Sequence, residues 1–329
     1  MRLSTRHRRH LGLLGVLISL AGTMALLSEH FLSAANLLGM TRHLAEVGII
    51  ACGMTLIVMT AGIDLSVGSL LALCSIVLGY AWQDWGLGPL AAVGLALAVG
   101  AAGGALNGAL VTRGGFPPLV ATLGTMALFR GAALRISEAR PVSGFPEMFE
   151  WIGQGYIGPV PAQTLAWAGV AGATAVVVAR TPIGPFTRAI GDNERAARFA
   201  ALPVAGVKLG LYTATGLATA VAALISTARF STARADAGDG LELEVIAAVV
   251  LGGTAITGGR GSVLGTVLGV LILGVARNGL TLAGVDQEWR SMMTGTILIA
   301  AAISDQWMAR RDMGRGRQSP ASPAATEAS

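Results

Sequence analysis

Hydrophobic positions in this chain gather into long apolar runs that are separated by short polar stretches. A helix needs about 20 apolar residues to cross a bilayer core about 30 Å thick, and ten runs approach that length. The eighth and the tenth are short. To within a few residues, the predicted spans are 11–27, 44–60, 65–82, 90–111, 119–136, 163–179, 209–228, 245–255, 263–276 and 292–303. The pattern predicts an all-α polytopic membrane protein.

Composition supports this reading. The chain is 53% hydrophobic and only 12% charged, whereas a soluble domain carries about 25% charged residues. Its 46 glycines suit membrane helices that pack closely through small residues. The sequence pI near 10 could suggest nucleic acid, but membrane orientation explains the basic residues better, so we expect no nucleic-acid partner.

The distribution of basic residues predicts the orientation. If the N-terminus is inside, most of the 23 Lys and Arg residues face the cytoplasm, so N-in and C-in with an even number of spans is favoured. Because Arg2, Arg6, Arg8 and Arg9 precede the first apolar run, that run could instead be a signal peptide. We favour a retained anchor, since more spans follow.

The domain organisation is simple. Residues 1–311 are predicted to form one transmembrane domain, and residues 312–329, rich in Gly, Ser, Pro and Ala, a disordered cytoplasmic tail. Between apolar runs, residues 181–208 form a polar stretch that a bilayer cannot hold, and residues 194–198 within it favour a helix. We interpret this segment as a docking surface on the inner face, through which a partner drives the protein.

A weak internal repeat is visible. Asp64 opens one apolar helix, and Glu242 with Glu244 opens another from the opposite side in the predicted topology. Asn107-Gly108 also resembles Asn278-Gly279 in sequence. Opposite entry sides are typical of an inverted-topology repeat, although similar Gly-rich helices also arise by chance.

Two charged residues suggest specific roles. Asp64 lies beside Ser66 and Gly68, so it is an element of a gate or pathway, or an ordinary cap of the next helix, and the two roles can coexist; Ser66 could also be that cap. Arg130 could pair with Glu242, Glu244 or Asp239 in the other half, or extend towards lipid headgroups.

Motifs for chemistry are missing from the sequence. The only lysine, Lys208, is followed by Leu209, so no phosphate-binding loop is possible, and the Gly-rich residues 252–262 are better read as a hairpin or broken helix. The four histidines lie near the N-terminus without metal-ligand spacing. We therefore expect no catalytic site, no metal and no cofactor bound by this chain. Few buried polar groups are evident, which predicts no deep substrate site.

Several strings together resemble a known family. They are TAGIDLSVGS, ALNGALVTRGGFPPLVATLGTMALFRG, SGFPEMFEWIGQG, AIGDNERAARFAALPV, GDGLELEVIAAVVLGGTAITGGRGSVLGT and ARNGLTLAGV. In this order and spacing, over about residues 45 to 302, they resemble the ribose-type permease subunits of bacterial ABC sugar importers.

The resemblance implies partners and site residues. ATP-binding subunits would use ATP and dock on cytoplasmic coupling helices, and a periplasmic solute-binding protein would deliver a monosaccharide. A second permease copy or paralogue would complete the pathway in the lipid of the inner membrane. The coupling residues implied are Gly191, Asn193, Glu194, Ala196, Ala197 and Arg198. The gate or pathway candidates are Asp64, Ser66, Gly68, Ser69, Asn107, Thr122, Thr125, Arg130, Glu242, Glu244 and Asn278.

The coupling segment departs from the family pattern twice, because Asp192 and Ala201 stand where glycine is common. Ala196, Ala197, Ala200 and Ala201 would offer a face of small residues to a groove in the partner. Three rival functions remain. They are a branched-chain amino-acid permease with the same general fold, an ion-coupled secondary transporter, which would need a relay of intramembrane acids or histidines, and an intramembrane enzyme.

Overall fold

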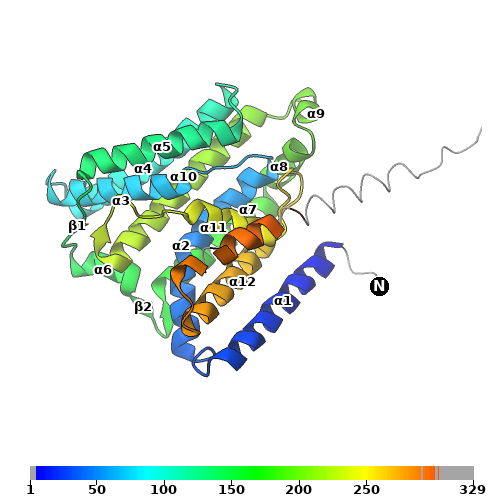
Figure 1. The fold of residues 1–329 in the computed structure, drawn as a ribbon. Helices are drawn as coiled ribbons and strands as arrows, with labels where there is room; N and C mark the ends of the chain where they lie inside the picture. Colours follow the sequence, from blue (N-terminus) through cyan, green and yellow to red (C-terminus); the bar gives the residue numbers. More distant parts are fainter. Residues whose placement is uncertain (1–4, 290–291, 301–302, 304–329) are drawn as a thin grey trace, which may run out of the picture.

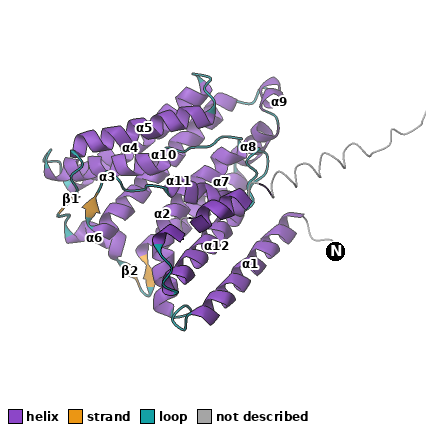
Figure 2. Ribbon diagram, viewed as in Figure 1, coloured by secondary structure: helices purple, strands orange, loops and turns teal. Residues whose placement is uncertain are grey.

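The computed structural model describes residues 5–289, 292–300 and 303, so the predicted tail at 312–329 lies outside the described residues. Nearly all of the regular structure is helical (Figure 2). Within the described ranges, seven helices are long and apolar enough to cross a membrane. They are α1 (Thr5–Leu27), α2 (Ala34–Met59), α4 (Pro89–Thr112), α5 (Pro118–Ser137), α7 (Ala162–Arg180), α10 (Val204–Phe230) and α12 (Val263–Leu282).

Helices α2 and α10 form the centre of the bundle and pack against each other (Figure 1). On one side, α3 (Val67–Gln83) and α4 pack on α10, and α5 covers α3. On the other side, α7, α11 (Leu241–Leu251) and α12 pack on α2, and α1 lies against α12 at the periphery. Most of the apolar stretch of α2 is buried, whereas very little of α1 is buried, as expected for a central and a lipid-facing helix.

The two ends of the bundle carry different small elements. At one end, here called the α9 end, α8 (Ile183–Asp192) and α9 (Glu194–Phe199) follow α7. At the other, the α6 end, lies α6 (Glu147–Gln154) with two antiparallel strand pairs. Strand β1 (Val142–Ser143) pairs with β4 (Thr232–Ala233), and β2 (Tyr156–Ile157) pairs with β3 (Val160–Pro161).

Two helices are too short to cross a bilayer alone. At 1.5 Å per residue, α3 spans roughly 25 Å and α11 roughly 16 Å. Each follows a non-helical segment, residues 60–66 after α2 and residues 231–240 after α10. These segments begin at opposite ends of the bundle and meet inside it. A Cβ on Gly68 would lie only 2.3 Å from the Gly238 carbonyl oxygen, so only glycine allows this approach.

Each predicted span coincides with helical residues in the described part of the chain, with different ends, while the count of ten membrane spans stays a prediction. Helix α2 begins ten residues before the predicted run, because its polar first turns do not register as hydrophobic, while Ser33 caps it by accepting a hydrogen bond from the Asn36 amide. Helix α11 begins and ends four residues earlier than predicted. The last predicted span contains helical residues at 292–300. The Gly-rich residues 252–262 form a turn-rich loop between α11 and α12.

We predict opposite effects of one substitution at two glycines of α4. A Cβ on Gly104 would lie 2.2 Å from the Tyr212 carbonyl oxygen of α10, whereas Gly94 has nothing within 4 Å. Gly104→Ala should therefore lower the free energy of unfolding in detergent by about 1–3 kcal/mol through overpacking. Gly94→Ala should raise it by about 0.5–1 kcal/mol through helix propensity. Equal melting temperatures for the two variants would contradict the close packing of α4 on α10.

Candidate functional site

A buried polar network surrounds Asp64 in the segment between α2 and α3. Asp64 is 1% exposed, and its Oδ1 accepts hydrogen bonds from the Ser66 amide (2.9 Å) and the Ser66 hydroxyl (2.7 Å). Asn107 of α4 donates from Nδ2 to Asp64 Oδ2 (3.2 Å) and to the Ser66 hydroxyl (2.8 Å). Thr125 of α5 donates to Asn107 Oδ1 (2.6 Å). Four predicted site residues from three elements thus meet in one network.

The network differs from a helix cap. Ser66 stands at the N-cap position of α3, but its side chain makes no capping hydrogen bond, because its hydroxyl donates to Asp64 instead. The expectation that the Ser66 side chain caps the helix is therefore wrong, whereas Asp64 does accept a backbone amide hydrogen bond, from Ser66, just before α3 begins. No Lys or Arg within the described ranges forms an ion pair with Asp64. Hydrogen bonds alone compensate the burial of this carboxyl group, which is costly without them.

Further hydrogen bonds fix the backbone around Asp64. The Ile63 carbonyl accepts from the Thr122 hydroxyl of α5 (3.3 Å) and from the Tyr212 hydroxyl of α10 (3.4 Å). Ser69 donates to the Ser66 carbonyl (2.8 Å). Side chains from two other helices thus satisfy the Ile63 carbonyl, which lies outside any helix.

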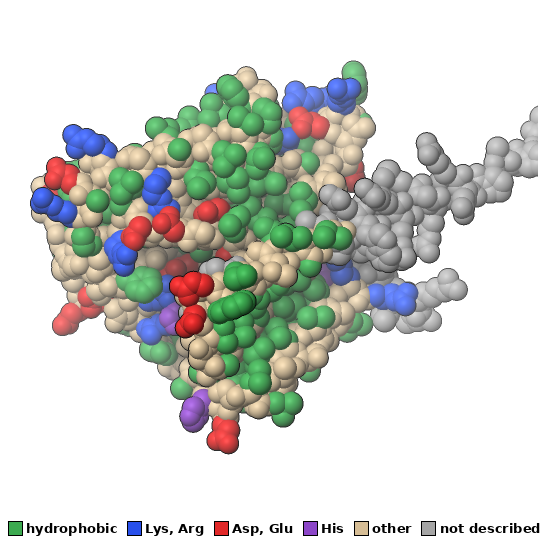
Figure 3. All heavy atoms as spheres, in the orientation of Figure 1, with side chains coloured by type: hydrophobic (Ala, Val, Ile, Leu, Met, Phe, Trp, Pro, Cys, Tyr) green, Lys and Arg blue, Asp and Glu red, His purple; other side chains and the backbone are tan. Residues whose placement is uncertain are grey.

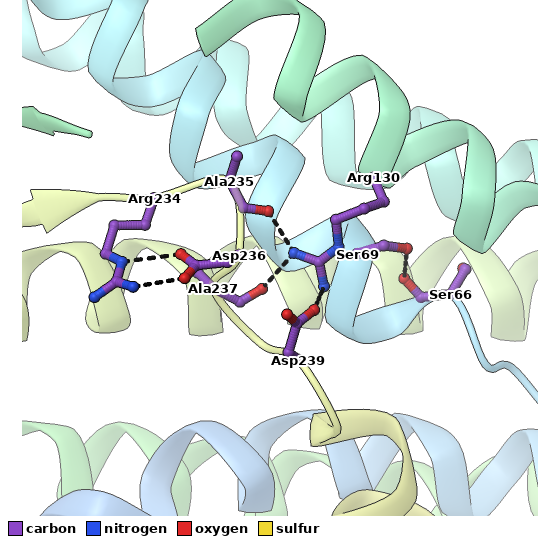
Figure 4. A network of polar contacts seen from close by, with 8 residues as sticks. All are labelled: Ser66, Ser69, Arg130, Arg234, Ala235, Asp236, Ala237 and Asp239. Atoms are coloured by element: carbon purple, nitrogen blue, oxygen red, sulfur yellow. Dashed lines mark hydrogen bonds and ion pairs between the residues drawn. The ribbon is translucent and has the colours of Figure 1, made fainter. Parts of the chain in front are cut away.

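Arg130 of α5 holds the second non-helical segment (Figure 4). Its guanidinium donates to the carbonyl groups of Ala235 and Ala237, the latter at 3.0 Å, and forms an ion pair with Asp239 at 2.5 Å. Of the three predicted acidic partners, Asp239 is thus the one bound. Arg130 is therefore not free to extend towards lipid headgroups.

The remaining acids and Asn278 lie elsewhere. Glu244 forms an ion pair with Arg277 of α12. Glu242 is 9% exposed, and its carboxylate lies beside Gly68. Asn278 of α12 exchanges two hydrogen bonds of 2.9 Å with Asn36 of α2, away from the Asp64 network.

The predicted coupling segment forms α8 and α9 at the α9 end. Asn193 lies between them and caps α9, accepting a hydrogen bond from the Ala196 amide (3.0 Å). Gly191 lies against the end of α2, since a Cβ there would be 2.0 Å from the Met59 carbonyl oxygen. A groove of about 430 Å³ lies beside this contact and is lined by the α8–α9 turn, the residues just after α2 and the start of α5. The segment thus contacts the helix that leads directly to Asp64.

Glu194 ties α9 to α10. It forms ion pairs with Lys208 (2.5 Å) and with Arg198 (2.6 Å), one turn further along α9. Partial burial raises the pKa of the Glu194 carboxyl, but hydrogen bonds and charges from Lys208 and Arg198 outweigh it and hold that pKa below its usual range. Because the folded-state pKa is lowered, the ion pairs persist at neutral pH and are lost only as pH falls through the lowered value.

Two corrections concern the surface of α9. Ala197 is 4% exposed and packs on Ile190 and Val204, so it faces inward and is not part of an accessible small-residue face with Ala196. Phe199, which the sequence analysis missed, is 93% exposed. Helical geometry could have indicated it. Side chains two residues apart on a helix point in directions about 200° apart, so an inward Ala197 places Phe199 outward.

One of the two departures from the family pattern places a non-glycine residue in an unfavourable backbone conformation. Ala201 has φ 58°, in the left-handed region where glycine is favoured, because the chain reverses there between α9 and α10. The alanine thus adopts the conformation that the family's glycine provides more easily.

These features define a class: a multi-pass membrane protein in which the two non-helical segments meet inside the bundle and the short helix α9 projects at one end. The family described as branched-chain amino acid transport system / permease component matches residues 36–302, and the chain belongs to this family.

Curated relatives cover nearly the whole chain. It is 42% identical over 287 residues to the ribose import permease protein RbsC of Bacillus subtilis (strain 168), covering 86% of this chain and 88% of that protein. It is 39% identical over 294 residues to RbsC of Escherichia coli (strain K12), covering 88% and 90%. The autoinducer 2 import system permease protein LsrD of Yersinia enterocolitica is 37% identical over 317 residues, covering 92% and 93%. No solved structure matches the chain.

The comparisons confirm the resemblance to ribose-type permeases that the sequence strings indicated. The roles assigned to individual gate and coupling residues stay predictions.

We predict energetic coupling between Asp64 and Asn107. Asp64→Ala and Asn107→Ala should each destabilise the protein, but the double variant should lose about 1–3 kcal/mol less than the sum, since each single change leaves a buried partner unsatisfied. Unfolding in detergent would measure the four variants of the cycle. A control cycle pairs Asp64→Ala with Asn278→Ala, whose hydrogen bonds go to Asn36, and should be additive. Additivity in both cycles would contradict the network.

Proposed function

We propose that this chain is the permease subunit of an ATP-driven importer in the bacterial inner membrane, and that it translocates a monosaccharide related to ribose. The ribose and autoinducer 2 import permeases among its relatives support this substrate class. The family's title also covers branched-chain amino acids, the alternative substrate. The chain itself binds no ATP in this proposal, and a docked ATP-binding subunit supplies the work.

The single observation that carries the proposal is the projecting α9 with its links to the interior. Phe199 offers an exposed aromatic side chain of the kind that anchors protein interfaces. Gly191 and the Glu194–Lys208 ion pair connect this surface to α2 and α10. A push on α9 would thereby reach the two central helices as a rigid-body movement. The coupling residues in this proposal are Gly191, Asn193, Glu194, Ala196 and Arg198, with Phe199 added and Ala197 as internal support.

The proposed topology has ten spans, the N- and C-termini inside, and an inverted repeat. It is supported by the two non-helical segments that begin at opposite ends and meet at Gly68 and Gly238. The α9 end then faces the cytoplasm and the α6 end the periplasm. A solute-binding protein would dock at the α6 end, and a second permease copy or paralogue would complete the pathway.

The test is uptake of radiolabelled ribose into proteoliposomes that contain the permease, its ATP-binding subunit and the binding protein. Accumulation that requires ATP on the side of the vesicle membrane where the ATP-binding subunit lies supports the proposal. Accumulation driven by a proton or sodium gradient without ATP would refute it, and preference for leucine over ribose would select the amino-acid alternative.

We predict that Phe199→Ala lowers ATP-driven uptake about tenfold or more, because truncation of a central aromatic anchor typically costs 2 kcal/mol or more. Thermal stability should stay unchanged, since this side chain is 93% exposed. Leu90→Ala at the start of α4, where the side chain is 89% exposed, serves as the control and should transport normally. Normal uptake by Phe199→Ala would remove α9 from the docking surface.

We also predict that Lys208→Met and Glu194→Gln each reduce the uptake per ATP hydrolysed by about two- to fivefold, as expected for a partly exposed ion pair. The double variant should be no worse than either single one, since both changes break the same link between α9 and α10. ATP hydrolysis and uptake would be measured in the same vesicles. Multiplied losses in the double variant would show that the two residues act separately.

A further inference from the structure

A cavity of about 930 Å³ lies inside the single chain towards the α6 end, between α2, α10, α11, α12 and residues 232–240. Its volume falls in the range of small-molecule sites, about 300–1,000 Å³. None of Asp64, Ser66, Asn107 and Thr125 lines it. The sequence predicted no deep site because few buried polar groups were evident. The polar residues that line this cavity come from separate helices and converge only in the fold, so the sequence alone did not show them together.

The carboxylates in the cavity lining form ion pairs with arginines. Glu46 pairs with Arg229 (3.1 Å), and Asp236 with Arg234 (2.5 Å). Glu244 forms an ion pair with Arg277, and Asp239 forms one with Arg130, which is not itself part of the cavity lining. Hydrogen bonding and the charge of Arg234 lower the pKa of Asp236 in spite of slight burial, so this acid stays ionised at neutral pH. Figure 3 shows acidic, basic and histidine side chains gathered on this face beside broad hydrophobic areas.

Mutual pairing limits what the cavity can bind. A zwitterionic amino acid or an anion needs an opposite charge without a partner, and it would have to break one of these pairs to obtain one. A neutral ligand with several hydroxyl groups needs no such charge, because paired carboxylates and guanidinium groups still have lone pairs and N–H groups for further hydrogen bonds.

Two hydroxyl groups in the lining lack partners. Ser75 of α3 and Thr227 of α10 are each 1% exposed, and among the described residues neither hydroxyl oxygen has a hydrogen-bond partner. An unsatisfied buried hydroxyl is costly, about 1–3 kcal/mol, so a ligand or bound water that hydrogen-bonds to either of them is favoured. Met40, Leu44 and Val47 of α2 add an apolar wall that suits the C–H faces of a sugar ring.

We propose that this cavity binds one molecule of a neutral polyhydroxylated solute within a single permease subunit, at a place separate from the Asp64 network. The choice of ligand class rests on the proposed function, whereas the cavity, its paired charges and its unsatisfied hydroxyls do not. Residues 236–240 form one wall of the cavity and are held from the other side by Arg130. An occupant therefore contacts the same segment that meets α3 at Gly68.

The test measures equilibrium binding to the purified full-length permease in lipid nanodiscs, without partner proteins. The probes are ribose, xylose, galactose and myo-inositol, with leucine and inorganic phosphate for comparison. We expect at least one polyol to bind saturably. Ser75→Ala and Thr227→Val should each weaken that binding about three- to tenfold, the effect of one hydrogen bond. Thr227→Ser keeps the hydroxyl and should bind as the native protein does.

Thr219→Val is the matched control, since Thr219 is also buried on α10 but donates to the Thr215 carbonyl (2.9 Å) outside the cavity lining. The proposal is overturned if no polyol binds, if binding ignores Ser75→Ala and Thr227→Val, if Thr219→Val weakens it equally, or if leucine or phosphate competes. Phe199→Ala should leave binding intact. Polyol binding without ATP-driven uptake would thus refute the proposed function and keep the site, and uptake without cavity binding would do the reverse.

Discussion

Burial of the Asp64 carboxyl group is the constraint on which the interior depends. A carboxyl group in the middle of an apolar bundle is tolerated only when donors surround it, and here they come from Ser66, Asn107 and, one step further, Thr125. Helices α4 and α5 must therefore lie beside the non-helical segment. The same segment leaves α3 short enough to begin within the bundle, next to the loop that Arg130 holds. One costly side chain thus fixes the positions of three helices and a connection.

Surface and interior are joined through few contacts. Gly191 lies against the Met59 carbonyl at the end of α2, and the Gly259 amide donates to that same carbonyl (3.0 Å). Five residues beyond Met59 the chain reaches Asp64. The proposed coupling surface is therefore connected to the network by a short stretch of backbone. The tight packing at Gly191 leaves little slack, since close-packed interiors transmit displacement instead of absorbing it.

Sequence patterns located the helices well because hydrophobicity is a local property, and they located the turn at Asp64 because an acid and glycines interrupt an apolar run. They could not choose the partner of Arg130. Asp239, Glu242 and Glu244 lie within six residues, and only the left-handed turns at Gly238 and Gly240 decide which one faces α5. They also missed the cavity, because Ser75 and Thr227 are unremarkable within their own helices and come to line one cavity only when α3 and α10 pack.

Lys208 has a chemical consequence that its ion pair with Glu194 does not by itself suggest. It is the chain's only lysine, its side chain is 9% exposed, and it lies in the joint between α9 and α10. Acylating reagents therefore have one side-chain amine to modify in this protein besides the α-amine of the chain, and it is shielded while the joint is closed. The native chain thus contains one side-chain reporter of that joint, and the rate of acylation at Lys208 follows the opening of α9 without any engineered label.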